Sequence, residues 1–179
     1  MTREIRVVPY DDNWPVLYDQ EISRINSVLE EEIISVHHIG STSIPGMSAK
    51  PIIDILLEVK DIVKIDRYDN QMIALGYKPR GELGIPGRRY FSREEPQDVR
   101  THHIHSFQTG NVGLERHLAF RNYMIAHPED VKTYSELKIV LARRFQWDID
   151  GYISGKHLYM ERMEIVALEW YRSLNSSNE

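Results

Sequence analysis

The chain has 179 residues, of which 41% are hydrophobic, 22 are basic and 27 are acidic, giving a formal net charge of -5. This length suffices for one domain that buries roughly two-thirds of the surface that its unfolded form would expose. The acidic excess would repel a polyanion, so duplex nucleic acid is not an expected partner. The sequence contains no cysteine, which excludes disulfides and thiolate zinc sites and leaves Asp, Glu and His as metal ligands.

The N-terminal sequence "MTREIRVVPYDDNWP" lacks the apolar core of a signal peptide. No apolar run in the chain approaches the roughly 20 residues that a membrane-spanning helix requires. Together with the lack of cysteine, these observations predict a soluble, cytoplasmic protein without a membrane partner.

A helix followed by two strands is predicted for the first third of the chain. Apolar side chains recur on one helical face over residues 14–29, with Asn13 as the expected N-cap. A run rich in branched residues at 33–39 ends at Gly40 and predicts a strand. The second predicted strand, residues 51–59, alternates between a core face and a face that carries Asp54.

The rest of the chain adds one helix, two strands and a helical tail. Residues 61–75 predict a helix that ends at Gly76, and "RRYFSRE" and "THHIHSF" predict strands. Apolar stripes predict further helices around 114–125, 128–141 and 154–174, and residues 175–179 are expected to fray. This order predicts an α+β fold, a mixed β-sheet covered by helices with a helical C-terminal part.

A glycine and three hydroxyl residues follow the first strand directly. Gly40 permits a close backbone approach, and Ser41, Thr42 and Ser43 add hydroxyl groups to the N–H groups of the turn. Such a turn can hold a phosphate. Equally, Gly40 could end the strand while Ser41 or Thr42 caps a short helix.

A lysine and an aspartate mark the second strand. Lys50 precedes the strand and could offset phosphate charge, while Asp54 could bind Mg²⁺. An unpaired carboxylate among isoleucines and leucines would lose solvation at a substantial cost, so Asp54 is expected to have a partner. Glu58 lies roughly 13 Å further along the strand, too far to share an ion. The position for a second carboxylate, two residues after Asp54, is Leu56.

Three histidines lie in "THHIHSF". On a strand, His103 and His105 project from one face about 7 Å apart, while His102 points the other way. The pair could bind a divalent metal or donate to a phosphate, or simply belong to a polar sheet face.

A phosphate ligand needs more than one positive neighbour. Arg121 and Lys138 fall on or beside apolar helical stripes, so we expect both to be directed inward. Arg89 completes the set that we expect to neutralise a phosphate tail, although any of these residues could be an ordinary surface charge.

The segment "HIGSTSIPGMSAKPIIDILLEV" resembles the pattern of the GrpB family nearly end to end. The resemblance continues in "VVPYDDNWP", "IPGRRYF", "HHIHSF", "HLAFRNYM", "YSELK" and "YISGK", so it covers almost the whole chain. It implies a single GrpB-type, nucleotidyltransferase-like domain over residues 1–174, because the family is similar to the polymerase-beta-type nucleotidyltransferases.

In that superfamily a Gly-Ser turn follows one strand, and a later strand supplies metal-binding carboxylates two residues apart. The resemblance therefore implies that Gly40 and Ser41 form the turn, that Asp54 is the catalytic carboxylate, and that Mg²⁺ or Mn²⁺ is the cofactor. The implied reaction transfers a nucleotidyl group from a nucleoside triphosphate to a hydroxyl. Leu56 departs from this pattern, which leaves turnover open, and His103 or His105 could supply the missing ligand.

Three functions stay open at this point. The first is a metal-dependent protein that binds a nucleotide or related phosphate compound and transfers its nucleotidyl group. The second is a module without catalysis that binds a metabolite or stabilises a partner. The third is a His/Asp metal-dependent hydrolase. GrpB-type domains also resemble a segment fused to dephospho-coenzyme A kinase, which suggests a partner enzyme of coenzyme A metabolism, and the aromatic helical tail could form a homodimer surface.

Overall fold

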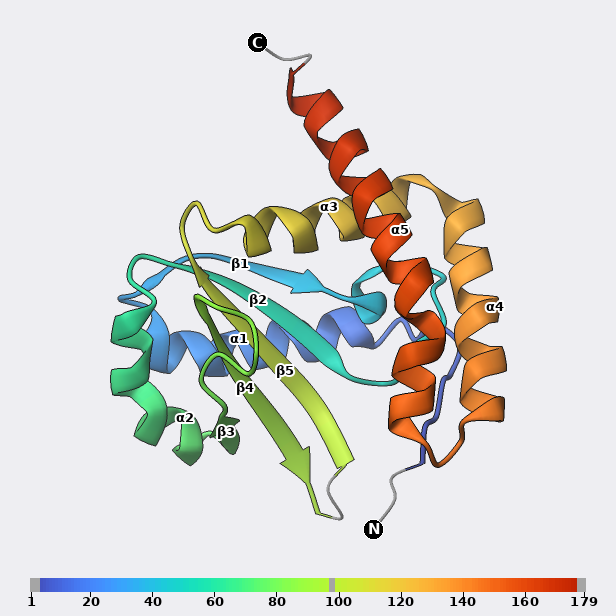
Figure 1. Ribbon diagram of the computed structural model, residues 1–179. Helices are drawn as coiled ribbons and strands as arrows, with labels where there is room; N and C mark the ends of the chain where they lie inside the picture. The colour runs from blue at the N-terminus through green and yellow to red at the C-terminus, as the bar shows by residue number, and fades with distance from the viewer. Residues whose placement is uncertain (1–3, 97–98, 177–179) are drawn as a thin grey trace.

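The computed structural model describes residues 4–96 and 99–176 (Figure 1). Its strands are β1 (Ile33–Ile39), β2 (Ile53–Val59), β3 (Tyr77–Pro79), β4 (Arg88–Glu95) and β5 (Val99–Gln108). The α-helices are α1 (Trp14–Leu29), α2 (Asp69–Ala74), α3 (Val112–Ala126), α4 (Pro128–Arg144) and α5 (Ile149–Ser176). Two 3₁₀-helices, η1 (Ser41–Ser43) and η2 (Val63–Tyr68), complete the described elements.

The strands form one mixed sheet in the order β1-β2-β5-β4-β3. Strands β2 and β5 are parallel neighbours at its centre, and the other pairs are antiparallel. The register places Asp54 beside His103 and Leu56 beside His105. Because residues in register project from the same face, the sheet brings the two histidines to the face that carries Asp54. The predicted α+β fold with a mixed sheet is confirmed.

The two faces of the sheet are covered differently. The odd-numbered residues of β2 pack with α1 in a large core that includes Trp14, Ile25 and Leu29. On the opposite face, Leu56 packs with Leu114 of α3. Both faces of β2 are therefore buried, and Asp54 lies on the face that α3 partly covers.

Helices α3, α4 and α5 form a second core beside the sheet (Figure 1). Ile44 and Met47, from the loop after η1, are fully buried in this core. The backbone N–H of Ser48 donates to Ser135 Oγ of α4 at 3.0 Å. The loop from η1 to β2 thus joins the sheet to the helical C-terminal part.

Two helices differ from the prediction. The segment expected as one helix over residues 61–75 is divided into η2 and α2. Within η2 only Ile65 is buried, so there is no continuous apolar stripe to stabilise one longer helix. Helix α5 begins at Ile149, earlier than the expected start near 154, because the burial of Tyr152 outweighs the low helix propensity of Gly151.

The end of the last helix and the smallest strand also differ from the prediction. Helix α5 continues through Ser176, beyond the expected end at 174, and residues 177–179 of the expected tail lie outside the described residues. Strand β3 was not expected, because three residues are too few for an alternating pattern. Within the described ranges, no helix is long and apolar enough to cross a membrane.

Candidate functional site

The Gly40–Ser43 turn is held tightly against β2. Gly40 has φ +70°, and a β carbon added there would lie 2.6 Å from Asp54 Oδ2. Thr42 is buried, and its hydroxyl donates to the carbonyl of Ile52 at 3.1 Å. Its oxygen also lies 3.0 Å from Nε2 of His38. Glycine is therefore required at position 40, and the Thr42 hydroxyl holds the turn in place.

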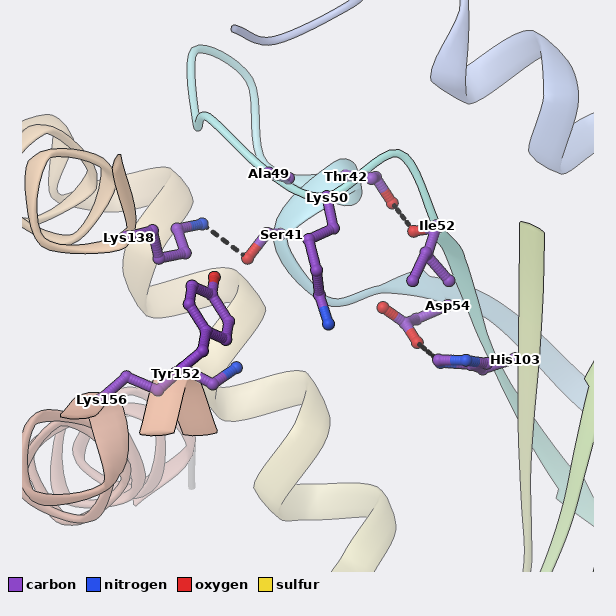
Figure 2. Close-up of a pocket in the computed structure, with 10 residues that line it drawn as sticks. All are labelled: Ser41, Thr42, Ala49, Lys50, Ile52, Asp54, His103, Lys138, Tyr152 and Lys156. Carbon is purple, nitrogen blue, oxygen red and sulfur yellow. Dashed lines mark hydrogen bonds and ion pairs between the residues drawn. The ribbon is translucent and has the colours of Figure 1, made fainter. Parts of the chain in front are cut away.

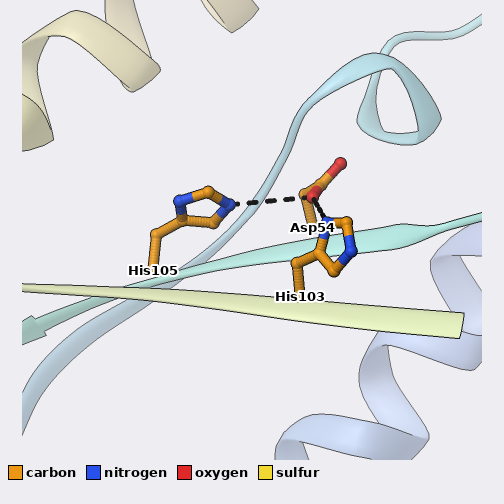
Figure 3. Close-up of side chains that lie close together, drawn as sticks. All are labelled: Asp54, His103 and His105. Atoms are coloured by element: carbon orange, nitrogen blue, oxygen red, sulfur yellow. Dashed lines mark hydrogen bonds and ion pairs between the residues drawn. The ribbon is translucent and has the colours of Figure 1, made fainter. Parts of the chain in front are cut away.

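Asp54 lies between this turn and the two histidines of β5 (Figure 3). Its Oδ1 is 3.0 Å from Nδ1 of His103 and 3.7 Å from Nε2 of His105. The partner that was expected for the Asp54 carboxylate is thus a pair of imidazole rings, those of His103 and His105. One ligand atom from each residue lies within 4.8 Å of the others, so the three could hold a metal ion.

The ionisation of this cluster follows from its surroundings. Burial alone would raise the pKa of Asp54, but hydrogen bonds and charge from His103 and His105 lower it well below its usual value. Burial lowers the pKa of His105, and Asp54 offsets only part of that effect. Behind them, burial lowers the pKa of His117 to about 3. Asp54 is therefore anionic at neutral pH and His117 is neutral.

A cavity of about 230 Å³ opens beside Asp54 (Figure 2). It is lined by residues of the turn, of β2 and β5, and of α4 and α5. These are Ser41, Thr42, Ala49, Lys50, Ile52, Asp54, His103, Lys138, Tyr152 and Lys156. Figure 2 shows Lys138, Lys156 and Ser41 on the side of the cavity across from Asp54 and His103, with the Lys50 side chain extending between the two sides.

The three lysines come from three separate parts of the chain. Lys138 of α4 is 2% exposed, and its Nζ donates to Ser41 Oγ at 2.9 Å. Burial, together with the charges of Lys156 and Lys50, lowers the pKa of Lys138 to about 7. Nζ of Lys50 and of Lys156 lie 5.5 and 5.3 Å from the centre of the Tyr152 ring. Three amines that repel one another surround one small space, which favours an anion there.

Two of the residues expected at a phosphate site lie elsewhere. Arg89 projects from the face of the sheet opposite to that of Asp54 and His103, and it pairs with Asp66. Arg121 Nη1 donates to the carbonyl of His38 at 3.1 Å, beside the outer strand β1. Helix α3 crosses that part of the sheet, whereas α4 and α5 bound the cavity. Neither arginine lines the cavity, so both predicted positions are corrected.

Tyr152 was not expected as a site residue, and Lys156 was one of several basic residues expected to be ordinary surface charges, although both line the cavity. They occur four residues apart in "YISGK", a spacing that places them on one face of a helix. That spacing was the available signal, but it does not indicate which face of α5 is directed towards the turn.

The chain is similar to known proteins over almost its whole length. The family described as GrpB protein matches residues 4–165. The UPF0157 protein YqkA of Bacillus subtilis is 45% identical over 176 residues, which cover 98% of this chain and 51% of YqkA. The crystal structure of the conserved protein GrpB from Enterococcus faecalis matches with a TM-score of 0.88 and 38% identity, covering 93% of this chain and 99% of that one.

A dephospho-CoA kinase of Mycolicibacterium paratuberculosis is 25% identical over 191 residues, which cover 93% of this chain and 46% of the kinase. The chain therefore spans about half the length of YqkA and of this kinase, but nearly all of the Enterococcus protein. Given the extent of the family match, the chain belongs to the GrpB family.

Proposed function

We propose that the chain binds a nucleotide, or a related compound with a phosphate chain, together with a divalent metal ion. The ligand occupies the cavity between the Gly40–Ser43 turn and helices α4 and α5. The proposed reaction is transfer of a nucleotidyl group to a hydroxyl acceptor. One observation carries the proposal: three lysines and Ser41 surround a cavity that also contains a carboxylate next to two histidines.

The anionic part of the ligand is assigned to the turn and the lysines. Ser41 Oγ and the backbone N–H groups of the turn donate to phosphate oxygens, since such a turn forms an anion-binding concavity. Lys138, which already bonds Ser41 Oγ, orients this hydroxyl and adds positive charge. Lys50 and Lys156 approach the same space from the loop before β2 and from α5. Gly40 and Thr42 keep the turn close to Asp54.

The metal is assigned to Asp54, His103 and His105, whose ligand atoms lie close enough together to share one ion. When bound, the metal would activate the acceptor hydroxyl and stabilise the leaving pyrophosphate. The charge of Asp54 is available for this role because its pKa is strongly lowered. The face of Asp54 away from the histidines is directed towards Gly40, where the phosphate is proposed to lie.

The test is a thermal-shift and calorimetric screen of the four ribonucleoside triphosphates and dephospho-coenzyme A with Mg²⁺ or Mn²⁺. Dephospho-coenzyme A is included because a relative of this chain is a dephospho-CoA kinase. A ligand at 100 times its Kd should raise the melting temperature by about 5–10 °C. Lys138→Ala and Asp54→Asn should each reduce that shift, the second only in the presence of metal.

Lys132→Ala is the matched control, because Lys132 lies on the same helix α4 but lines a different pocket. It should keep the full ligand response. A response that Lys132→Ala loses as readily as Lys138→Ala would contradict the proposed site. So would a screen in which no phosphate compound stabilises the parent protein.

A second candidate function is a binding module without catalysis. Leu56 favours it, because this residue is fully buried where the superfamily pattern has a second carboxylate. The two candidates separate in one assay, the release of pyrophosphate from the bound triphosphate across a range of hydroxyl acceptors. Retained ligand without pyrophosphate supports the module, and its release supports the transferase.

A further inference from the structure

The resemblance to nucleotidyltransferases implies a pair of Mg²⁺ ions on two carboxylates, and the structure offers only one carboxylate there. Leu56 is fully buried in a cluster with Ile39, Phe107 and Leu114, so it contributes no ligand. Glu58, further along β2, accepts a hydrogen bond from Ser35 at 2.7 Å and belongs to a different region. Mg²⁺ prefers near-octahedral coordination by oxygen, and β2 supplies a single oxygen ligand, Asp54.

Nitrogen ligands occupy the place of the missing carboxylate. His105 lies in register with Leu56 on the parallel strand β5, and His103 lies in register with Asp54. Both rings are directed towards Asp54 (Figure 3). The second carboxylate of the pattern is thus replaced across the strand pair by imidazole.

The separations suit one transition metal ion. Bonds of about 2.1 Å to a shared ion put neighbouring ligand atoms roughly 3.0–3.4 Å apart. Asp54 Oδ1 lies 3.0 Å from His103 Nδ1 and 3.7 Å from His105 Nε2, so the three atoms need only small shifts to bind one ion. Imidazole suits Fe²⁺, Ni²⁺, Cu²⁺ and Zn²⁺, whereas carboxylate, carbonyl and water suit Mg²⁺ and Mn²⁺.

The groups around the two rings differ in how they relate to a bound ion. Nε2 of His105 faces Asp54, and Arg88 Nη1 lies 3.4 Å from the other ring nitrogen, Nδ1. A neutral His105 that binds a metal through Nε2 carries its proton on Nδ1, and Arg88 is a donor only, so Arg88 has to shift when the ion binds. Nε2 of His103 is buried and has no hydrogen-bond partner among the described residues, and the same is true of Ser92 Oγ. Ser92 lies opposite His103 in the β4–β5 register. A metal at Nδ1 would fix the proton on Nε2, and a ligating histidine commonly donates that proton to a neighbouring acceptor, here Ser92.

We propose that Asp54, His103 and His105 form a site for one transition metal ion, of the Fe²⁺ to Zn²⁺ series, that discriminates against Mg²⁺. This inference rests on the metal-binding part of the proposed function and specifies its chemistry. It also reduces the two-ion arrangement of the superfamily to a single ion, with the lysines beside the cavity supplying the remaining positive charge.

The test titrates Mg²⁺, Mn²⁺, Zn²⁺ and Co²⁺ into the metal-stripped protein without any nucleotide. Calorimetry gives stoichiometry and affinity, and the visible absorption of Co²⁺ reports nitrogen ligation directly. The expected result is one ion per chain, with Mg²⁺ bound at least 100-fold more weakly than Co²⁺ or Zn²⁺. His103→Ala and Asp54→Asn should weaken Zn²⁺ binding by more than the roughly 10–100-fold that loss of a supporting partner costs.

His157→Ala is the control, because His157 is exposed on α5 and pairs with Glu161 away from the cavity. It should leave metal affinity unchanged, and circular dichroism should confirm that each variant is folded. Mg²⁺ binding within tenfold of Zn²⁺, or full Zn²⁺ affinity in folded His103→Ala, would overturn the inference. Because this titration contains no nucleotide, it tests the metal site alone. One bound ion here, combined with no response to any phosphate compound in the ligand screen, would leave this inference standing and remove the proposed function.

Discussion

Gly40 and Asp54 are mutually dependent: a β carbon at Gly40 would lie 2.6 Å from Oδ2 of Asp54. The turn that is proposed to hold phosphate can lie over the carboxylate only because position 40 has no side chain. The pair thereby sets the distance between the proposed phosphate and metal subsites.

Gly40→Ala should destabilise the protein more than Gly46→Ala. Both glycines have positive φ, so both substitutions introduce backbone strain of about 1–3 kcal/mol. Only at Gly40 does the new methyl group meet another residue, since nothing lies within 4 Å of a β carbon at Gly46. Urea unfolding measures the excess, which is the additional loss of unfolding free energy in Gly40→Ala compared with Gly46→Ala. That excess should shrink in an Asp54→Ala background, which removes the contact with Oδ2 but keeps the Cβ of residue 54 at 3.1 Å. An unchanged excess there would show that the Asp54 carboxylate is not its cause.

Anion binding in the cavity should weaken as pH rises above about 7. The Lys138 ammonium is present below its pKa of about 7 and is lost above it, and a bound anion favours the charged form. Sulfate is a suitable probe because its charge is constant between pH 6 and pH 9. Calorimetric titrations across this range should show falling affinity for the parent protein.

Lys138→Arg should flatten that pH profile, because a guanidinium stays charged throughout the range. An equally steep decline in Lys138→Arg would assign the effect to another group, with Lys50 and Lys156 as the neighbouring amines.

Removal of the two neighbouring hydroxyls of the turn should affect different properties, stability for Thr42 and anion binding for Ser41. Thr42→Val removes a buried hydrogen bond to the Ile52 carbonyl and should cost about 1–3 kcal/mol of unfolding free energy. Ser41→Ala should change stability less but weaken sulfate binding, because Ser41 Oγ faces the cavity and bonds Lys138. Paired urea unfolding and sulfate titrations check both variants. Weaker sulfate binding in Thr42→Val than in Ser41→Ala would reverse these assignments.

Glu21→Gln should destabilise the opposite face of the sheet. Glu21 is 4% exposed and accepts hydrogen bonds from Arg24, Arg93 and Tyr77. Breaking such a buried ionic network costs about 3–5 kcal/mol at neutral pH. Glu115→Gln, which removes the ion pair with Arg172 on the surface, is the control and should change stability little.

The cost of Glu21→Gln should depend on pH. Burial would raise the pKa of Glu21, but hydrogen bonds from Tyr77 and Arg24 and the charges of His102 and Arg93 lower it below its usual value. A carboxylate with a lowered pKa contributes stability above its unfolded pKa and loses that contribution on acidification. The difference between parent and variant should therefore narrow below about pH 4. A difference that is constant from pH 7 to pH 3 would argue against the ionic network.

Local patterns predicted the elements that depend on local forces. The helix over residues 14–29 and the strand over 33–39 have the predicted bounds, because each has a regular apolar period and a clear end. The inward direction of Lys138 followed from its place beside an apolar stripe. That His103 or His105 could join Asp54 was only one possibility from the sequence, since their nearness depends on which strands pair and in what register.

The positions of Arg89 and Arg121, which lie away from the cavity, could not be predicted for the same reason. In "RRYFSRE" consecutive residues alternate between faces, and only the pairing of β4 with β5 decides that Arg88, not Arg89, shares the face of His105. Likewise the face of α5 that carries Tyr152 and Lys156 meets the turn only because α4 and α5 pack beside the sheet. Tertiary arrangement, which sequence spacing does not contain, selects the members of the site.

The positions of the lysines in the sequence decide at which stage of synthesis the cavity becomes complete. Asp54, His103 and the turn emerge from the ribosome first, whereas Lys138 and Lys156 belong to the last two helices. A nascent chain can form the sheet and the cluster of aspartate and histidines before the cavity has its cationic wall. Binding of an anion at the complete cavity therefore becomes possible only after α4 and α5 have been synthesised and have packed beside the turn, so a phosphate ligand would report that these helices have folded.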